Sequence, residues 1–569
     1  MGKYTLSFNL LFALLLQELL VGVPYKDVSI LVVEDQRPFL VLLKSLLTNL
    51  GAKDVMMATQ ADHALKYCRN HKIDIVVCDL HLGSNKKNGY ELYQELMHRK
   101  LLAPTSVFLL ISADAARPVV LGSLEHNPDD YLLKPFSQAQ IKNRLNKAWK
   151  KNQFFHDVYN ALSDEQYSVA HTLLESMDVP AVYYRESIHL KVEVFWAQRK
   201  YAEAISLLQS ETALLPSQWA QLALGKSYLA KREFQLAIKC AAKVLELNRY
   251  DPDAHDIIAQ AKSALHFPEE AMENMRLALK YSPYSLARQQ LASQIALKNG
   301  DFPLLVESSL ATWQLSKNTI FKRISYWCNH IGFLLDAAEA AENKAQRHRY
   351  QQEALLQVQR ARHDDAILRL DEPFDIDIFT DIVSARVDVI DGKLIDAKKT
   401  IMASQINIES RFTEYPASLA PGSIQTLLNL GEFEEVNRVL NTLKEEKTEL
   451  DHGTRQLIAQ YSEQAKDGED KYTHINRRGI QLYQEEKYAD AKEAFTTALG
   501  LAPVNTGIAL NLLQCQVKLF GQANKLDPLL VKEARQVYKI VNNAPMREQH
   551  QAKFENLRDE LIRLGVTTR

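Results

Sequence analysis

The chain has 569 residues, so several domains are expected. Its hydrophobic content of 46% and charged content of 24% are ordinary for a globular protein, and a net charge of −2 gives no general reason to expect nucleic acid or an anionic membrane as a partner. The five cysteines form no CxxC pair and no metal-finger spacing, which is typical of reduced thiols in a cytosolic protein.

Residues 1–24 contain an apolar stretch, LSFNLLFALLLQELLVGV, that follows Lys3. Taken by itself, this pattern is typical of a signal peptide or a membrane anchor. However, Asn9, Gln17 and Glu18 interrupt it, and no small-residue cleavage pattern follows. We therefore expect an additional amphipathic helix or a start codon assigned too early, and an N-terminal membrane anchor is the alternative.

Residues 25–150 alternate between short apolar strands and segments with helical spacing. The strands are SILVV, DVMMA, IDIVVC, VFLLI and DYLL, and the helical segments are RPFLVLLKSLLTNLG, QADHALKYCRNH, GYELYQELMHR, RPVVLGSLEH and SQAQIKNRLNKAWKK. This alternation predicts an α/β fold with a doubly wound, five-stranded parallel sheet covered on both faces. Gly51 stands where the first helix should end, as a C-terminal cap.

Polar residues occur at the points where the predicted strands end. Glu34 and Asp35 follow the first strand, and Asp79 ends the third. Ser112 ends the fourth strand, and Lys134 follows the fifth. Because the carboxyl ends of parallel strands meet at the ligand-binding edge of such a sheet, we expect three carboxylates, a hydroxyl and an ammonium to converge there.

Three carboxylates that lie close together raise one another's pKa values and would not all stay ionised unaided. A divalent cation removes this difficulty, and Mg²⁺ prefers oxygen ligands. Together with Lys134, Mg²⁺ would offset the charge on a transferring phosphoryl group, which leaves Asp79 as the nucleophile and an acyl phosphate as the product. The sequence therefore predicts a phosphoacceptor site that uses Mg²⁺.

The motifs ILVVEDQRP, DIVVCDLHLG, LLISAD and DDYLLKPF, in this order and spacing, resemble the receiver domain of bacterial two-component response regulators. The resemblance implies a flavodoxin-like strand order. It also implies that Asp79 accepts a phosphoryl group from a phosphohistidine of a sensor or hybrid histidine kinase. The metal ligands that it implies are Asp35, Asp79, Glu34 directly or through water, and the backbone carbonyl of His81.

The same resemblance assigns roles to residues near the ends of the fourth and fifth strands. Ser112 would donate a hydrogen bond to the phosphoryl group, and Lys134 would pair with it. The peptide before Pro135 would be cis, an arrangement that proline makes tolerable. Tyr131 matches the aromatic residue that turns inward on activation.

The loop after Asp79 departs from the family pattern. LHLGSNKKNGYEL replaces a loop that is usually shorter before the glycine equivalent to Gly89. We expect Lys86 and Lys87 of this loop to border the site, where they would alter the fit of a partner or the lifetime of the phosphoryl group. A haloacid-dehalogenase-type phosphatase also uses a nucleophilic aspartate, but it needs a second aspartate where this chain has His81.

Beyond residue 150 the strand pattern ends and helical spacing continues. An aromatic residue followed three positions later by alanine occurs at Tyr167, Tyr201 and Phe234. The same register continues, with one member of each pair changed, at Pro268 and Phe302. Spacings of 34, 33, 34 and 34 residues predict an all-α, tetratricopeptide-type array of helix hairpins, which bury enough surface only when they stack.

Two later segments, DGKLIDAKKTI with Gly392 and GEFEEVNRVL with Gly431, read as degenerate repeats, and HINRRGIQLYQEEKYADAKEAFTTALGLAP reads as a well-formed one. The expected domains are the N-terminal segment (1–24), the receiver (25–150), tetratricopeptide repeats (151–316), irregular helical repeats (317–470), and a final repeat with C-terminal capping helices (471–569).

The output of this chain is expected to be the repeat array, which would bind protein segments. After residue 150 the sequence contains no helix-turn-helix with a basic recognition helix, and nothing in it supports an enzyme active site in residues 317–470. We expect a response regulator rather than an enzyme, apart from self-catalysed phosphotransfer and slow dephosphorylation. The alternative is a constitutive scaffold with a vestigial receiver.

The predicted partners are the kinase and an unidentified protein target of the array. No nucleic acid and no small-molecule substrate other than phosphoryl donors is expected. Phosphotransfer from a kinase would place Asp79 in the cytoplasm. The fifth receiver helix, around Ile141 to Trp149, leads directly into the first repeat, so the phosphoryl state is expected to change how the receiver docks on the array.

Overall fold

A computed structural model describes residues 22–83, 87–113, 128–214, 217–368, 371–522, 527–546 and 548–566. The helix expected at residues 117–126, Lys86, and nearly all of the apolar N-terminal segment lie outside these ranges. The chain divides into two compact units. Unit 1 extends to Asn299 and includes Gln314–Lys322, and unit 2 comprises Gly300–Trp313 and the chain from Arg323 onward. No helix of the described ranges is long and apolar enough to cross a bilayer.

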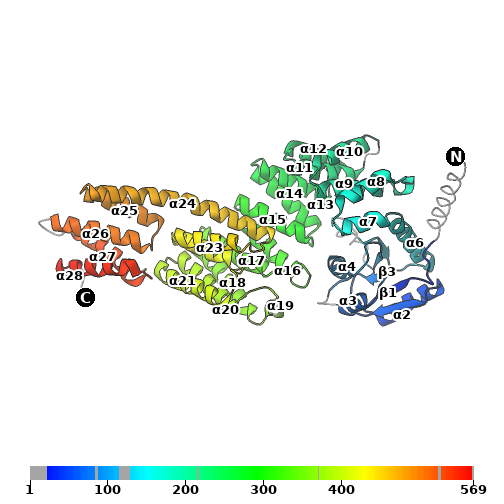
Figure 1. Cartoon of the computed structure of the whole chain (residues 1–569), viewed down its shortest axis with the longest axis horizontal. Coiled ribbons are helices and arrows are strands. Elements are labelled where there is room, and N and C mark those ends of the chain that lie inside the picture. Colours follow the sequence, from blue (N-terminus) through cyan, green and yellow to red (C-terminus); the bar gives the residue numbers. More distant parts are fainter. Residues whose placement is uncertain are drawn as a thin grey trace, which may run out of the picture. The chain divides into compact units, whose positions relative to one another are not determined.

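Unit 1 begins with five parallel strands in the order β2-β1-β3-β4-β5 (Figure 1). They are β1 (Ser29–Val33), β2 (Asp54–Ala58), β3 (Ile75–Asp79), β4 (Val107–Ser112) and β5 (Asp130–Leu133). This is the flavodoxin-like order that the resemblance to receiver domains implies. The register pairs Val33 with Cys78, and Asp79 with Ile111. The strands therefore end together at one edge of the sheet.

Four described helices cover the sheet: α2 (Arg37–Asn49), α3 (Ala61–Asn70), α4 (Gly89–His98) and α6 (Gln138–Phe154). Successive residues of β1 point to opposite faces. Ile30 and Val32 belong to the hydrophobic core with α2 and α6, whereas Leu31 and Val33 belong to the core with α3 and α4. Gly51 follows α2 with a φ of 105°, as expected of a glycine cap.

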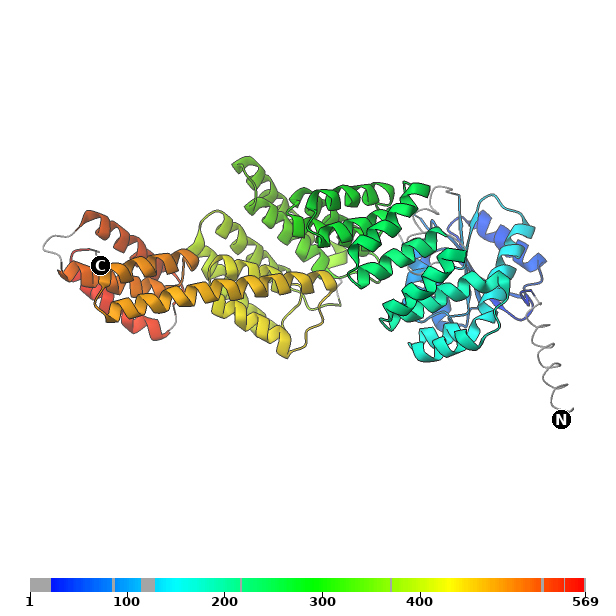
Figure 2. The same ribbon diagram turned by 90° about the horizontal axis from the view of Figure 1, so that it is seen from above.

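Pairs of helices follow the sheet, and within the described ranges no strand interrupts them (Figures 1 and 2). Their helices are α7 (His156–Ser163), α8 (Tyr167–Ser176), α9 (Tyr184–Ala197), α10 (Tyr201–Leu214), α11 (Gln218–Ala230), α12 (Phe234–Leu247), α13 (Pro252–Ala264), α14 (Pro268–Tyr281), α15 (Leu286–Asn299) and α16 (Phe302–Ser316). The second helix of each pair begins at a predicted repeat position, so the period in the sequence is the period of the hairpins.

Each of these helix pairs is joined through a residue with a left-handed backbone, two positions before its second helix begins. The residues are Glu165, Arg199, Arg232, His266 and Gly300, with φ values between 56° and 70°. A left-handed residue ends one helix and redirects the chain within a few residues. The shared turn explains why the period persists at Pro268 and Phe302, where the aromatic or alanine signature has changed.

Unit 2 is also helical. Its further helices are α17 (Ile324–Glu339), α18 (Lys344–Ala361), α19 (Asp365–Leu368), α20 (Ile376–Ile390), α21 (Leu394–Arg411), α22 (Ala420–Asn429), α23 (Phe433–Glu445), α24 (His452–Gln484), α25 (Tyr488–Leu501), α26 (Thr506–Gln522), α27 (Pro528–Asn543) and α28 (Glu548–Arg563). The left-handed turn recurs at Gly392, Gly431 and Glu486, two residues before α21, α23 and α25. The degenerate segments therefore share the turn of the regular repeats.

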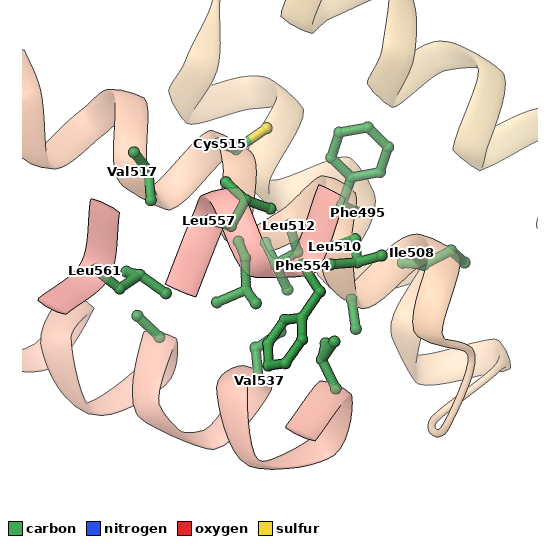
Figure 3. Close-up of a cluster of buried hydrophobic side chains, with 14 of the residues drawn as sticks. Phe495, Ile508, Leu510, Leu512, Cys515, Val517, Val537, Phe554, Leu557 and Leu561 are labelled. Carbon is green, nitrogen blue, oxygen red and sulfur yellow. The ribbon is translucent and has the colours of Figure 1, made fainter. Parts of the chain in front are cut away.

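The 33-residue helix α24 passes through residue 470, where a domain boundary is expected, as one continuous element. Its C-terminal part forms a hairpin with α25. Beyond that hairpin, Phe495, Val537, Phe554 and Leu557 meet in one apolar cluster formed by α25 to α28 (Figure 3). Full burial of a side chain of this size contributes roughly 1.5–3 kcal/mol, so this cluster stabilises the C-terminal end of the chain.

A buried ion pair connects α21 and α23 to the loop after α25. The ammonium of Lys398 lies 2.7 Å from Oε1 of Glu432 and 2.9 Å from the carbonyl oxygen of Val504. Beside it, Gly431 approaches the end of α25 so closely that a Cβ atom at this position would lie 2.3 Å from Cα of Ala502. Unit 2 therefore needs glycine at position 431 for space as well as for backbone conformation.

We expect Gly431→Ala to lower the free energy of unfolding of unit 2 by about 3 kcal/mol, because it adds a clash with backbone to the cost of a left-handed alanine. Gly392→Ala is the matched control. Gly392 has a φ of 80° and no neighbour within 4 Å of the added Cβ, so this change should cost only about 1 kcal/mol. Urea unfolding of the full chain, monitored by hydrogen exchange in α23 and α25, measures the loss of unfolding free energy in each variant. Equal losses would contradict the packing explanation.

His330 of α17 is a fully buried histidine within unit 2. Its Nδ1 lies 2.8 Å from the hydroxyl of Ser309, and its Nε2 lies 3.2 Å from the amide nitrogen of Gln357. Burial lowers its pKa from the ordinary 6.5 to about 4. The folded chain therefore binds a proton here more weakly than the unfolded chain does.

Stability that depends on neutral His330 is fully present above pH 6.5 and is lost as the pH falls toward 4, because the unfolded state takes up the proton first. We expect a loss of about 2 kcal/mol between pH 7.5 and pH 5. His330→Gln should remove this part of the pH dependence, whereas His348→Gln, at an exposed position of α18, should not. Calorimetry of the full chain across this pH range tests both variants, and identical pH profiles would contradict the assignment.

Candidate functional site

The edge where the strands end brings together two buried carboxylates and one ammonium. Nζ of Lys134 lies 2.8 Å from Oε2 of Glu34 and 2.8 Å from Oδ2 of Asp79. Glu34 follows β1, Asp79 ends β3, and Lys134 follows β5, so three separate strands contribute to the cluster. The Lys134–Pro135 peptide is cis, which agrees with the expectation from the sequence.

The carboxylates at this edge differ in exposure. Glu34 is fully buried, Asp79 is 4% exposed, and Asp35 is exposed. One oxygen of each of these three residues lies within 4.8 Å of the others. Burial of a charged group is costly unless it is paired. A single ammonium therefore serves two buried acids, with a third acid beside them on the solvent side.

The pKa values of the site reflect this imbalance. Burial, followed by the charge of Asp79, raises the Glu34 pKa above its ordinary value, and the hydrogen bond from Lys134 only partly opposes the rise. For Lys134, burial is the largest single influence and lowers the pKa, but the hydrogen bonds to Asp79 and Glu34 outweigh it and the pKa is raised. Lys134 is therefore held as an ammonium, and added positive charge would favour the ionised form of Glu34.

Backbone hydrogen bonds hold these residues at the edge. The amide of Leu80 donates to the carbonyl of Ile111 at 2.8 Å, which continues the pairing of β3 with β4 past Asp79. The amide of Lys134 donates to the carbonyl of Ser112 at 2.8 Å. The amide of His81 donates to Oδ1 of Asp79 at 3.4 Å. The acceptor side chain is therefore oriented by its own loop.

The remaining predicted residues lie on the same strands. Ser112 is buried at the end of β4, and its own backbone carbonyl accepts the hydrogen bond from the amide of Lys134. Tyr131 of β5 is half-buried and packs against the core shared with α3 and α4. The side chain of His81 is exposed. The structure thus gathers Glu34, Asp79 and Lys134 by direct contact, and Asp35 by proximity.

Phe39 is a site residue that the sequence reasoning missed. Nζ of Lys134 lies 4.1 Å from the centre of its ring, within the range of a cation–π contact, and its ring meets that of Phe136 edge-on at 6.0 Å. The two phenylalanines therefore form an apolar support beneath the ammonium. The sequence did offer a signal for these two residues: Phe39 ends the segment RPF just after Glu34 and Asp35, and Phe136 ends the segment KPF that begins with Lys134.

The start of α4 packs against the end of β3. A Cβ atom on Gly89 would lie 2.2 Å from the carbonyl oxygen of Asp79, so only glycine fits at the start of this helix. The ammonium of Lys87 lies 2.7 Å from Oε2 of the buried Glu95 and 3.7 Å from Oδ1 of Asp62. Lys87, expected to border the acid cluster, is thus paired with acids on α3 and α4. Lys86 lies outside the described residues.

An all-oxygen set of acids around a buried edge is the chemistry that Mg²⁺ prefers. Glu34, Asp35 and Asp79 supply three carboxylates, and the raised pKa of Glu34 indicates that added positive charge would be favourable here. The residues present therefore fit a divalent cation, and the nearby ammonium of Lys134 suits the oxygens of an anionic group.

Residues 30–146 match the family model of the response regulator receiver domain. The chain is 34% identical, over 137 residues, to the alkaline phosphatase synthesis transcriptional regulatory protein PhoP of Bacillus subtilis, a match that covers 24% of this chain and 55% of PhoP. It is 27% identical, over 126 residues, to the chemotaxis protein CheY-3 of Vibrio cholerae, covering 22% of this chain and 95% of that protein. The chain therefore spans only about half the length of PhoP.

Two solved structures align with parts of this chain. The receiver domain of the Francisella response regulator 1452 is 23% identical and covers 22% of this chain and 98% of its own, with a TM-score of 0.20. A thermophilic TPR protein of Thermus thermophilus is 12% identical and covers 32% of this chain and 99% of its own, with a TM-score of 0.27.

We expect Lys134→Met to lower the opening free energy of β1 and β3 by about 3 kcal/mol, because it leaves two buried carboxylates without a cation. Added Mg²⁺ should restore part of this loss. Hydrogen exchange of the full chain with and without Mg²⁺ measures both effects. Lys142→Met, at an exposed position of α6, is the control and should change stability by less than about 0.5 kcal/mol. A Lys134→Met loss that Mg²⁺ leaves unchanged would argue against a cation at this edge.

Proposed function

Residues 30–146 are a receiver domain homologous to those of two-component response regulators, and we propose that this chain is itself a response regulator in which Asp79 is the phosphoacceptor. The observation that supports this most directly is the ammonium of Lys134, placed 2.8 Å from both Asp79 and Glu34. A carboxylate at the open edge of the sheet, with a cation and further acids beside it, has the groups that phosphoryl transfer needs.

The proposed donor is a phosphohistidine of a sensor or hybrid histidine kinase. A carboxylate oxygen of Asp79 forms a bond to phosphorus while the phosphorus–nitrogen bond breaks, and the bonding electrons return to the departing imidazole. The product is an acyl phosphate on Asp79. A histidine kinase that phosphorylates Asp79 would place this domain in the cytoplasm.

The carboxylates of Glu34, Asp35 and Asp79, with the backbone carbonyl of His81, would hold Mg²⁺. The ion would neutralise charge on the transferring phosphoryl oxygens. Lys134 already donates to Asp79 and Glu34, and in the phosphorylated state it would donate to a phosphoryl oxygen instead.

The proposed response to the phosphoryl group uses two residues of neighbouring strands. The hydroxyl of Ser112, at the end of β4, would donate to a phosphoryl oxygen. Tyr131, three residues before Lys134 on β5, would turn further inward. Ser112 and Tyr131 lie on β4 and β5, the strands nearest to Lys134. A movement of the Lys134 side chain would therefore be transmitted to these two residues through a few residues of backbone.

The proposed output is the helical part of the chain, divided into repeats (151–316), irregular repeats (317–470), and a last repeat with capping helices (471–569). Stacked helix hairpins present extended surfaces that bind protein segments. The phosphoryl state of Asp79 would switch which protein target these surfaces bind. Beyond its own phosphorylation and slow dephosphorylation, the chain would carry out no catalysis.

Incubation of the full chain with radiolabelled acetyl phosphate and Mg²⁺ should incorporate label that is stable to electrophoresis and sensitive to hydroxylamine, as an acyl phosphate is. Asp79→Asn should reduce incorporation by at least about 100-fold, because the amide cannot act as the nucleophile. Asp62→Asn, at an exposed aspartate of α3, should label like the unchanged protein.

A phosphorylated histidine kinase serves as the second donor in the same assay. Absence of label from both donors would overturn the proposal and favour a constitutive scaffold whose receiver no longer signals. Label that persists in Asp79→Asn would show that another residue is the acceptor.

A further inference from the structure

One short segment of unit 1, residues 129–134, runs from the side of the sheet where the strands begin to the side where they end and where the acceptor lies. Residues 130–133 form β5, with Asp129 immediately before the strand and Lys134 immediately after it. The side chain of Lys134 contacts Asp79. The side chain of Asp129 lies at the other end of the strand, where the sheet meets the first hairpins.

Asp129 is held firmly at that edge. Its Oδ2 accepts a hydrogen bond from the amide of Phe108 at 2.8 Å, and its own amide donates to the carbonyl of Phe108 at 3.0 Å. Its Oδ1 lies 3.5 Å from Nζ of Lys151 in α6. The Asp129 side chain is only 15% exposed, and its burial raises its pKa while the Lys151 ammonium opposes the rise.

Lys151 is shared between the receiver and the hairpins. Its Nζ lies 3.7 Å from Oε1 of Glu186, in the first turn of α9, which is nearly the same distance as to Asp129. The same oxygen of Glu186 accepts a hydrogen bond from the hydroxyl of Tyr159 in α7 at 3.0 Å. One ammonium therefore contacts a carboxylate just before β5 and a carboxylate of α9, which in turn accepts a hydrogen bond from a hydroxyl of α7.

We propose that Lys151, held between Asp129 and Glu186, is the joint through which the phosphoryl state of Asp79 reaches the helical array. This inference rests on the proposed function and adds the route of regulation. It places the route along β5 and through the partly exposed ion pairs of Lys151 with Asp129 and Glu186. This route is in addition to any change in how an outer face of the receiver docks.

The charges at the two ends of β5 explain how a signal could pass from Lys134 to Lys151. A phosphoryl group adds negative charge and three acceptor oxygens beside Lys134, which must move to reach them. Lys134 directly follows β5, and its amide is hydrogen-bonded to the carbonyl of Ser112 in β4. A displacement of Lys134 therefore moves β5. Since the attraction between charges changes inversely with distance, a small shift of Asp129 alters how Lys151 is shared with Glu186.

The experiment cuts the array side of the joint and leaves the receiver side in place. Glu186→Gln removes the charge that faces Lys151 but keeps an oxygen for Tyr159. Hydrogen exchange in α7 to α9 is measured in the full chain before and after phosphorylation with acetyl phosphate and Mg²⁺, with label on Asp79 counted in parallel. In the unchanged protein, exchange in these helices should shift on phosphorylation. In Glu186→Gln that shift should be lost, with label incorporation unchanged.

Two further variants keep the test decisive. Tyr159→Phe removes one hydroxyl from the joint and should weaken the shift even if Glu186→Gln folds poorly. Lys100→Ala is the matched control, because its ammonium makes another contact between the receiver and a hairpin, 2.8 Å from the carbonyl of Ser163, away from β5. This variant should respond as the unchanged protein does.

The outcomes separate this inference from the proposed function. Absence of label on Asp79 overturns both. Normal label with no exchange shift in the unchanged protein, or with the full shift in Glu186→Gln, overturns the joint alone. Loss of the shift in Lys100→Ala to the same degree as in Glu186→Gln would show that docking in general, rather than the shared ammonium, carries the signal.

Discussion

The ammonium of Lys134, shared by two buried carboxylates, is the interaction on which the candidate site depends. A buried acid without a cation is costly, and the ammonium of Lys134 between Glu34 and Asp79 offsets that cost. That pairing constrains the chain around it. β1 and β3 must be neighbours, and β5 must end where the side chain of Lys134 can reach past β4 to their acids. The ring of Phe39 must lie next to the ammonium.

The helical part follows a different constraint, which concerns the backbone more than any side chain. A left-handed residue stands two positions before the second helix of each regular hairpin in the described chain. Arginine, glutamate and histidine occupy this place as well as glycine, although a left-handed conformation costs a non-glycine residue about 1 kcal/mol or more. The stacking of hairpins must offset that cost, which shows how strongly packing fixes the turn.

The sequence was sufficient for the strands and for the meeting of Glu34, Asp35, Asp79 and Lys134 at one edge, because near-continuous apolar runs alternate with helical segments and the carboxyl ends of parallel strands meet. The order of the strands followed from the resemblance to receiver domains. The sequence was insufficient where distant residues compensate one another. The pairing of Lys87 with Glu95 depends on where α4 lies relative to its loop. The continuity of α24 through residue 470 is also set by packing: Gly468, a residue that disfavours helix, lies within it. A Cβ atom at this position would lie only 2.6 Å from the ring of Phe433.

If β5 couples the acceptor to the array, thermodynamic linkage makes that coupling reciprocal. A protein that binds the array and favours one position of α9 also favours one balance between the Lys151–Asp129 and Lys151–Glu186 ion pairs. It thereby favours one position of Asp129, and through β5 one position of Lys134. Such a target would bias the acceptor toward or away from its phosphorylated state by the same free energy with which phosphorylation biases binding. The target and the kinase would then act on one equilibrium from opposite ends of a single strand.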